Sequence, residues 1–312
     1  MNSDTRRGVG FGFGAYLLWG IFPLYFRLLD RSGALEILLH RILWSLILCF
    51  VLITVGRSWD ELRAVFRSAR QTSILTAAAA LIAVNWGVYI YAVNSGQVVE
   101  ASLGYFINPL VTVALGVLVL RERLRVTQWT AVGIGVVAVA VLTVDYGHVP
   151  VIALSLACSF GTYGLLKNTV GSGTDGVGAV AGLTTETLVL APFAAITVIV
   201  LSLHGDSTFT ANPPWQALLL ASTGLITVGP LLLFASAARR VPLTTMGLLQ
   251  YLTPVLQLLC GVLVLGEHMP PSRWIGFALV WTALAVLTFD SLRAARRNYR
   301  TRAVDRELSR AA

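Results

Sequence analysis

The sequence predicts an all-α polytopic membrane protein with ten transmembrane helices in two inverted repeats of five. Three observations support this fold class. The chain of 312 residues is 56% hydrophobic and only 12% charged, with a mean hydropathy of +0.76. Its apolar runs reach the length of about 20 residues that a helix needs to cross a bilayer. Finally, a long segment recurs in the second half of the chain.

This composition excludes a water-soluble fold. Soluble domains carry about 25% charged residues, and a small protein keeps a large surface that must face water. We therefore expect the lipid bilayer to surround most of the chain. The net charge of +8 does not indicate a nucleic-acid partner, because the basic residues lie in short connectors and a tail without an aromatic-rich RNA motif. Attraction to anionic lipid head groups is the better interpretation.

Apolar windows place the spans in order along the chain. The first follows the start MNSDTRRG without a cleavage site, so we interpret it as a retained span. Long Leu- and Ala-rich runs without period-2 alternation exclude a membrane barrel, and short connectors predict one compact bundle. The expected spans are 8–28, 36–55, 73–93, 100–120, 127–145, 149–166, 178–203, 215–236, 245–265 and 272–290.

The basic residues predict the orientation of these spans. Most of the 23 Lys and Arg residues fall in alternate connectors and at the two ends of the chain. Positive residues favour the cytoplasmic side, so both termini are predicted in the cytoplasm. The Arg-rich tail, 291–312, is expected either to lie on the inner membrane surface or to be a disordered segment that only enforces topology.

The internal repeat relates EASLGYFINPLVTVALGVLVLRER, at 100–123, to MGLLQYLTPVLQLLCGVLVLGEH, at 246–268. Adding 145 to the first numbering aligns Pro109 with Pro254 and one GVLVL run with the other. Five spans separate the copies, so the second half is predicted to enter the membrane upside down, as in many alternating-access transporters. We expect a first repeat at 1–146, a second at 147–290, and then the tail.

Polar residues inside lipid are costly and usually face a cavity or another helix. The fourth and ninth spans each carry three such side chains at i, i+3 and i+7, which places them on one helical face. We predict that the two faces oppose each other near the midplane and line a substrate path. The alternative is hydrogen bonding in a dry bundle. The two sets are Tyr105, Asn108 and Thr112, and Gln250, Thr253 and Gln257.

Further aromatic and amide side chains, most of them in other spans, extend the candidate path. Rings with polar tips suit flat organic substrates, although they also suit membrane packing and interface belts. These further candidates are Tyr16, Trp19, Asn85, Trp86, Tyr89, Tyr163 and Tyr251. Pro109 and Pro254 lack an N–H donor and are expected to kink their helices. A kink frees a backbone carbonyl for a ligand or water, or it only shapes packing.

The second span opens with EILLHR and carries a group of charges. Glu36 and His40 are four residues apart and can share one helical face, and Arg41 follows them. They form either a proton or charge relay, since histidine titrates near neutral pH, or an outer-face ion pair that orients the helix. Glu186 in the seventh span is the nearest acidic counterpart, with no histidine or arginine beside it. Glu100 is left without a role.

No catalytic, metal or cofactor site is predicted. No Ser/His/Asp or Cys/His constellation stands out, and HExxH, a Walker loop and G-x-S-x-G are absent. The three cysteines lie far apart without metal-ligand spacing. These observations disfavour an intramembrane enzyme.

The segment YAVNSGQVVEASLGYFINPLVTVALGVLVLRERL closely resembles the signature of EamA-type permeases of the drug/metabolite transporter superfamily. AYLLWGIFPLYFRLL, EILLHRILWS and LLQYLTPVLQLL are similar to its RarD branch, and the similarity covers about residues 8–290. The resemblance implies ten helices in two inverted halves, an inner-membrane permease, and a central cavity formed by helices 1, 3, 4, 6, 8 and 9. One departure is LGEH in the second copy, where the first has LRER.

The first functional interpretation is a secondary transporter that exports small organic solutes, metabolites or drugs, by alternating access. A non-transporting membrane assembly or sensor protein is the alternative. The inverted repeat favours the transporter, because neither a sensor nor an enzyme needs two pseudo-equivalent states. Substrate, direction, coupling ion and a homodimeric state are left open.

Overall fold

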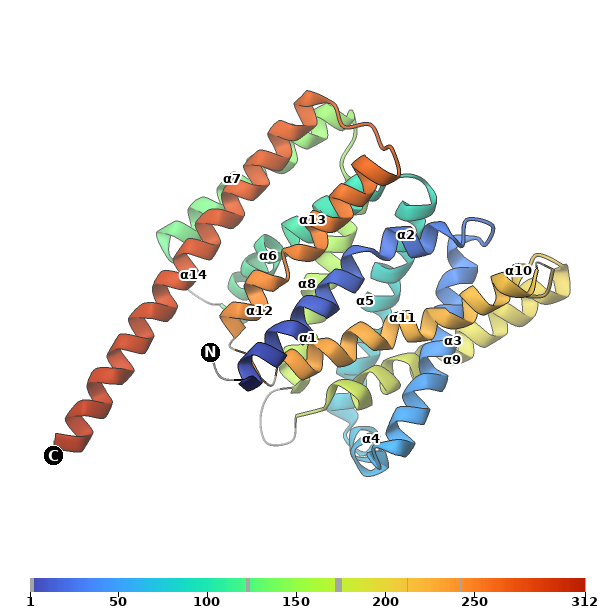
Figure 1. The fold of residues 1–312 in the computed structure, drawn as a ribbon, viewed down its shortest axis with the longest axis horizontal. Helices are drawn as coiled ribbons and strands as arrows, with labels where there is room; N and C mark the ends of the chain where they lie inside the picture. The colour runs from blue at the N-terminus through green and yellow to red at the C-terminus, as the bar shows by residue number, and fades with distance from the viewer. Residues whose placement is uncertain are drawn as a thin grey trace.

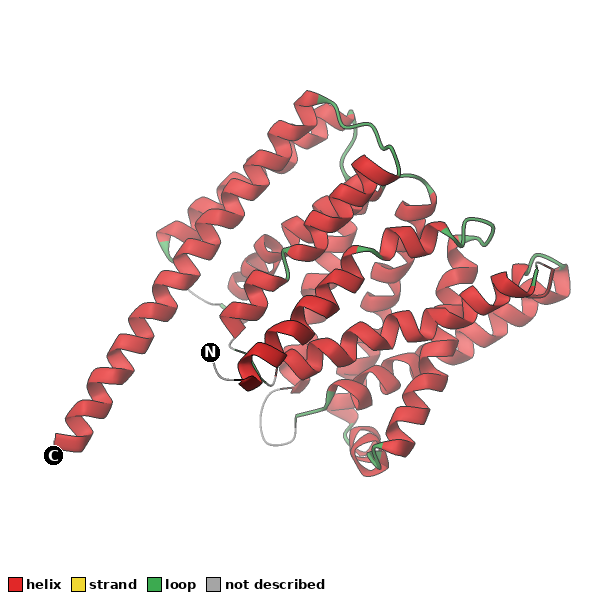
Figure 2. Cartoon of the chain, viewed as in Figure 1, coloured by secondary structure: helices red, strands yellow, loops and turns green. Residues whose placement is uncertain are grey.

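The computed structural model describes residues 3–121, 124–171, 176–211, 213–238, 240–241 and 243–311. Within these residues it is a bundle of helices without a β-strand (Figure 2). The helices are α1 Ser3–Gly20, α2 Phe22–Arg27, α3 Ala34–Val55, α4 Trp59–Arg67, α5 Ala69–Asn94, α6 Val98–Leu120, α7 Val126–Tyr146, α8 Val151–Gly171, α9 Ala179–His204, α10 Thr208–Ala211, α11 Pro214–Ala238, α12 Leu243–Leu249, α13 Leu252–Leu259, η1 Cys260–Val264 (a π-helix) and α14 Pro271–Ala311.

Eight helical segments of the described chain are long and apolar enough to cross a membrane. The first of them joins α1 and α2, and the others lie in α3, α5, α6, α7, α9, α11 and α14. The sixth predicted span corresponds to α8, which carries more polar side chains, and the ninth is divided into α12, α13 and η1. The multi-pass helical fold is therefore confirmed, while the count of ten spans stays a prediction.

The two repeat-related prolines differ in their effect on the backbone. Helix α6 runs without a break through Pro109. In the second half, Gln250 and Tyr251 form a turn between α12 and α13. A proline ring clashes with the carbonyl four residues earlier, and for Pro254 that residue is Gln250. The break before Pro254 thus has a local cause, whereas the helix around Pro109 accommodates its proline.

The helices lie next to one another in a definite sequence from one end of the bundle to the other (Figure 1). Helices α7 and α14 lie side by side at one end and contact α6. Helix α8 packs against α5 and α6, and α1 packs against α11 and α13. Helix α3 packs between α9 and α11 at the opposite end. Positions of close approach carry glycine: a Cβ on Gly224 of α11 would lie 2.6 Å from the Trp44 carbonyl oxygen on α3.

Two segments differ from the elements expected from the sequence. Helix α14 continues to Ala311 and extends beyond the bundle (Figure 1), so the structure has no break at the expected tail boundary of 290/291. The connector after the second span contains α4, a short helix with Leu62 and Val65 buried. Both regions are helical in the structure, whereas the hydropathy windows place them in a connector and in the tail.

Candidate functional site

The candidate site is centred on Arg41, about two turns into α3. Arg41 is only 4% exposed. Its Nε donates a hydrogen bond to Thr227 Oγ1 on α11 at 2.8 Å. The guanidinium carbon lies 4.1 Å from the ring centroid of Trp86 on α5, and Phe22 and Phe26 of α2 follow at 5.8 and 5.6 Å. A cation thus lies among aromatic faces, an arrangement that stabilises it electrostatically.

Amide and phenol groups from α5 and α6 lie beside this cation. Asn85 Nδ2 donates to Leu156 O and Ser159 Oγ on α8, both at 3.1 Å. The Tyr105 hydroxyl donates to Asn85 Oδ1 at 3.3 Å, and the rings of Tyr89 and Tyr105 are 5.8 Å apart. The structure therefore brings together four of the predicted path residues, Asn85, Trp86, Tyr89 and Tyr105.

The rest of the predicted stripe on α6 faces α8 or its own helix. Asn108 Oδ1 lies 3.3 Å from the point where a Cβ of Gly161 would be, and it has no hydrogen-bond partner among the described residues. Thr112 is exposed and donates to the Asn108 carbonyl at 3.0 Å. A buried amide oxygen without a partner is the group in this stripe most ready to accept a ligand hydrogen bond.

The matching stripe on the second half faces α1. Thr253 Oγ1 donates to Tyr16 O at 3.0 Å, and Gln257 Nε2 donates to Trp19 O at 3.1 Å. Pro23 explains the second contact, since it cannot supply the helical N–H that would bond Trp19 O. The two stripes are thus directed at α8 and α1 rather than at each other. Their role in a substrate path stays a prediction.

The remaining path candidates lie outside the Arg41 cluster. Tyr16 and Trp19 form an aromatic group with Phe234 of α11, with ring centroids 5.5 to 6.1 Å apart. Gln250 is half-buried in the turn between α12 and α13. Tyr251 lines a separate groove, and Tyr163 contacts Glu186.

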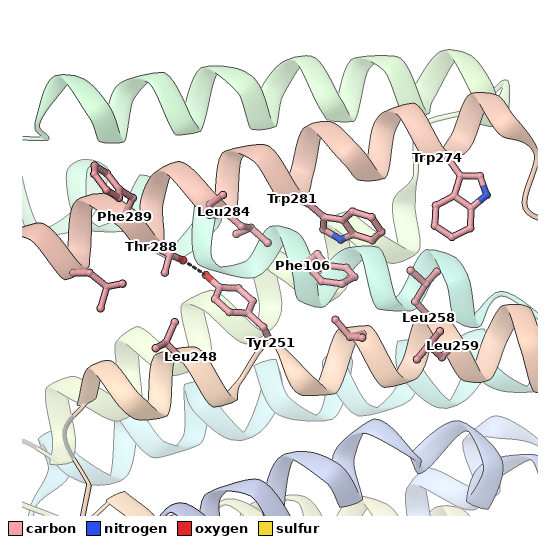
Figure 3. Close-up of a pocket in the computed structure, with 13 residues that line it drawn as sticks. Phe106, Leu248, Tyr251, Leu258, Leu259, Trp274, Trp281, Leu284, Thr288 and Phe289 are labelled. Carbon is pink, nitrogen blue, oxygen red and sulfur yellow. Dashed lines mark hydrogen bonds between the residues drawn. The ribbon is translucent and has the colours of Figure 1, made fainter.

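That groove, of about 730 Å³, lies between α13 and α14, with Phe106 of α6 among its lining residues (Figure 3). Its lining is almost wholly apolar, and the hydroxyls of Tyr251 and Thr288 lie 3.4 Å apart within it. Several lining side chains, Trp274 and Phe289 among them, are exposed on the outside of the bundle. It carries no charged residue to select a polar solute, so we centre the candidate site on Arg41.

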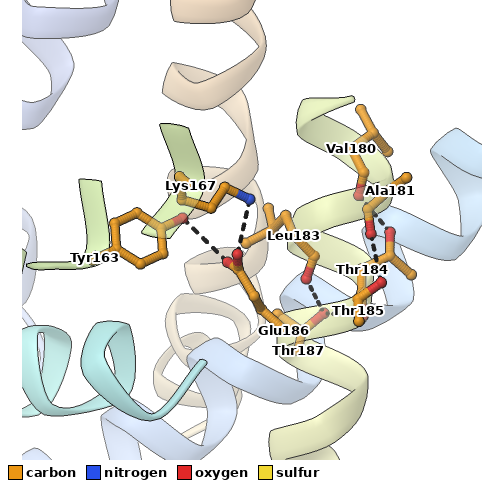
Figure 4. Close-up of polar contacts among 9 residues, drawn as sticks. All are labelled: Tyr163, Lys167, Val180, Ala181, Leu183, Thr184, Thr185, Glu186 and Thr187. Atoms are coloured by element: carbon orange, nitrogen blue, oxygen red, sulfur yellow. Dashed lines mark hydrogen bonds and ion pairs between the residues drawn. The ribbon is translucent and has the colours of Figure 1, made fainter. Parts of the chain in front are cut away.

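Glu186 is fully buried in α9 and has a counter-ion, Lys167, that is not among the residues predicted from the sequence. Lys167 Nζ lies 2.8 Å from Glu186 Oε1, and the Tyr163 hydroxyl donates to Oε2 at 3.1 Å (Figure 4). Lys167 and Tyr163 are four residues apart on α8 and share a face. This spacing is a signal in the sequence, but Lys167 directly follows the sixth predicted span, 149–166, and therefore falls in a connector of the prediction.

Glu36 is bound to the segment before α11, separately from Arg41. Its carboxylate accepts hydrogen bonds from Ser207 Oγ at 3.0 Å, from Thr208 N at 2.7 Å and from Thr208 Oγ1 at 2.6 Å. His40 stacks on Phe209 with ring centroids 4.7 Å apart. Glu36 and His40 thus share a face as expected. The expectation of an outer-face pair is not met, because both side chains are buried; a relay role stays a prediction.

Replacing Glu36 with Ala is expected to destabilise the protein by about 1.5–3 kcal/mol, because charged hydrogen bonds to the Ser207–Thr208 turn are lost. The measurement is the free energy of unfolding in mixed micelles. The control is Asp206→Ala, which changes an exposed carboxylate in the same connector and should have no measurable effect. An equal effect of the two substitutions would contradict the assigned role of Glu36.

Two other glutamates cap helices of the bundle. Glu100 Oε1 accepts from Ile152 N at 3.0 Å, at the start of α8. Glu267 accepts from Val98 N at 2.6 Å and Val99 N at 2.7 Å, at the start of α6. Helix N-termini have free N–H groups and favour negative charge. This gives Glu100 the role that the sequence left open. Glu122, the repeat mate of Glu267, and Arg123 lie outside the described residues.

Comparisons with known proteins identify the family of this chain. The EamA-like transporter family model matches residues 6–144 and again 151–289. "Protein RarD" of Streptomyces exfoliatus is 52% identical over 296 residues, covering 95% of this chain and 92% of that protein. "Protein RarD" of Escherichia coli K12 is 40% identical, covering 94% and 98%. "Uncharacterized transporter YojE" of Bacillus subtilis 168 is also 40% identical, covering 94% and 97%.

A solved crystal structure with 20% sequence identity covers 92% of this chain and 98% of its own, with a TM-score of 0.58, and so shows the same fold. The helical architecture and these matches define the class of protein, a multi-pass membrane transporter. The chain belongs to the EamA-like transporter family and is of the RarD type. This is a family of transporters, and it indicates no catalytic activity.

Proposed function

We propose that this protein is a secondary transporter that moves small organic solutes, metabolites or drugs, out of the cell across the cytoplasmic membrane by alternating access. Both termini lie in the cytoplasm, as the distribution of Lys and Arg favours. The observation that carries the proposal is the pair of family matches, one to each half of the chain.

Helix packing supports two inverted halves, 1–146 and 147–290. An offset of 145 relates α1–α2 to α8, α3 to α9, α5 to α11, α6 to α12–α13 and α7 to α14. Contacts follow the same relation: α5 packs against α8, and their counterparts α11 and α1 pack together. Likewise α6 contacts α8, while α13 contacts α1. Two halves of this kind can exchange their arrangements to open on alternate sides.

The proposed substrate path runs past Arg41 and the polar cluster on α5 and α6. Trp86 and Tyr89 supply apolar surface with polar tips, and Asn85 with Tyr105 supplies hydrogen-bonding groups. Concave sites for small solutes combine aromatic walls with a few placed polar groups. The helices involved include the third and fourth spans, which the family resemblance assigns to the central cavity.

Deletion and overexpression of the gene are expected to change the concentration of the same small organic solute in opposite directions. For an exporter, deletion should raise its concentration inside the cell and overexpression should raise it outside. Mass-spectrometric metabolite profiling of both compartments measures this. Overexpressed Asn85→Leu should lose the effect because its contacts to α8 and Tyr105 are removed. Thr282→Val should keep it, since Thr282 is exposed and bonds its own helix. Unchanged profiles in every strain would contradict a transport function.

A further inference from the structure

We propose that Arg41 binds the carboxylate of the transported solute, so that the substrates are organic carboxylates with an aromatic or apolar body. The assignment of a transported solute rests on the proposed function, whereas the binding site itself can be tested separately.

Arg41 is a buried cation without a carboxylate partner among the described residues. Taking a charge out of water costs several kcal/mol unless an opposite charge or hydrogen bonds replace the water. A guanidinium has five N–H donors, and the structure gives only Nε a hydrogen-bond acceptor, Thr227 Oγ1. The aromatic faces of Trp86, Phe22 and Phe26 stabilise the cation but cannot accept its remaining N–H groups as a carboxylate would.

The buried and half-buried carboxylates of the described chain already bind other groups. Glu36 binds the Ser207–Thr208 turn, Glu100 and Glu267 bind helix N-termini, and Glu186 binds Lys167. Two aspartates pair with other arginines. Asp145, near the end of α7, lies 3.0 Å from Arg273, and Asp290, in α14, lies 2.7 Å from Arg125. No internal counter-ion therefore remains for Arg41 within this part of the chain, and an external anion can fill the role.

The second half of the protein provides an internal comparison. The offset of 145 places Glu186 at the position of Arg41, and Lys167 at the position of Phe22. In the second half the two positions form an ion pair of 2.8 Å. In the first half the guanidinium carbon of Arg41 lies 5.8 Å from the Phe22 ring. The equivalent pair of positions therefore carries two opposite charges in the second half, but in the first half it carries the charge of Arg41 without a counter-ion.

The surroundings of Arg41 match a carboxylate attached to a flat apolar group. The guanidinium carbon of Arg41 lies 5.6 Å from the Phe26 ring, and the rings of Tyr25 and Tyr89 lie 5.4 and 6.0 Å from that same ring. Tyr105 follows at 5.8 Å from Tyr89. Tyr25 and Tyr105 donate to protein acceptors, while the Tyr89 hydroxyl has no partner among the described residues. Guanidinium and phenol can both donate to one carboxylate, which arginine binds in a bidentate fashion. The rings of Phe22, Phe26 and Trp86 around the guanidinium supply apolar surface for the rest of the solute.

Binding of matched acid and amide pairs to the purified protein in lipid nanodiscs tests this site. The probes are benzoate with benzamide, and indole-3-acetate with indole-3-acetamide, followed by thermal shift and by equilibrium dialysis of labelled compound. We expect at least one acid to bind saturably and at least about tenfold more tightly than its amide, since the amide cannot form the ion pair. Arg41→Gln should abolish this preference, Arg41→Lys should keep part of it, and the exposed Arg63→Gln should leave it unchanged.

A second variant guards against a folding defect in Arg41→Gln. Phe22→Glu places a carboxylate at the position equivalent to Lys167 and so gives Arg41 an internal counter-ion. The affinity for the acids should then fall at least about tenfold, although Arg41 itself is unchanged. Equal binding of acids and amides to the wild type would overturn the proposal. So would an absence of saturable acid binding, or an acid preference that survives in either folded variant, Arg41→Gln or Phe22→Glu.

Flux into proteoliposomes separates this inference from the proposed function. Acid binding without flux of any labelled solute would leave the Arg41 site standing and contradict the transporter. Flux of neutral solutes, with no preference for acids, would leave the transporter standing and overturn the Arg41 site.

Discussion

Replacing Lys167 with Met is expected to lower the free energy of unfolding by about 3 kcal/mol. Breaking a buried ion pair by removing one partner typically costs about 3–5 kcal/mol, and we expect a value toward the lower end of this range. The Glu186 carboxylate is fully buried, and Lys167 is its counter-ion at 2.8 Å. Without the lysine the carboxylate keeps only the Tyr163 hydrogen bond. The lower end applies because the Lys167 side chain is 27% exposed.

The free energy of unfolding in mixed micelles measures this effect. The double variant Lys167→Met, Glu186→Leu should recover most of the loss, because it removes the stranded charge together with its partner. Arg63→Gln, which breaks an exposed pair with Asp60, is the control and should change little. A Lys167→Met protein as stable as the wild type would contradict the role of this pair.

Replacing Gly224 with Ala is expected to destabilise the protein by about 1–3 kcal/mol through overpacking. The new Cβ would lie 2.6 Å from the Trp44 carbonyl oxygen and 2.9 Å from the Trp44 Cβ. A backbone oxygen cannot rotate away as a flexible side chain can, so α3 and α11 must separate. Alanine favours the helix over glycine by about 1 kcal/mol, which reduces but does not reverse the loss.

Two glycines without neighbours within 4 Å provide the controls, Gly133 of α7 and Gly164 of α8. Their replacement by Ala should leave stability unchanged or raise it by up to about 1 kcal/mol, since only helix propensity changes. Thermal unfolding of the three variants in one detergent compares them directly. A Gly224→Ala protein that behaves like the two controls would show that α3 and α11 are not packed as closely as described.

Most of the helical framework could be predicted from the sequence, because helices in lipid must satisfy their own backbone and so carry long apolar runs. The second span, expected at 36–55, is Ala34–Val55 in the structure. The sequence predicts a kink at both Pro109 and Pro254, but only the second helix breaks, at Gln250. Which of the two helices breaks could not be predicted, because the two prolines are equivalent in sequence and differ in their surroundings. Helix α4 is too short and too charged for a hydropathy window to detect.

The sequence predicts several residues of the candidate site but not how they are arranged in space. Polar tips inside apolar spans mark four of the path candidates in the sequence, and the structure groups these four near Arg41: Asn85, Trp86, Tyr89 and Tyr105. The sequence suggests a group of Glu36, His40 and Arg41 because they are near neighbours in one span. Arg41 directly follows His40, however, and consecutive residues on a helix point in different directions. The partners Thr227 of Arg41 and Lys167 of Glu186 come from other helices, and no local pattern marks such contacts.

Solute flux into proteoliposomes tests most directly whether this protein transports. The labelled solute is the one that metabolite profiling identifies, and the liposomes are preloaded with the same compound unlabelled. We predict saturable uptake that requires the protein, is accelerated by the preloaded solute, and is lost in Asn85→Leu but kept in Thr282→Val. If the folded protein moves no labelled solute under any gradient, the proposed transport function is wrong.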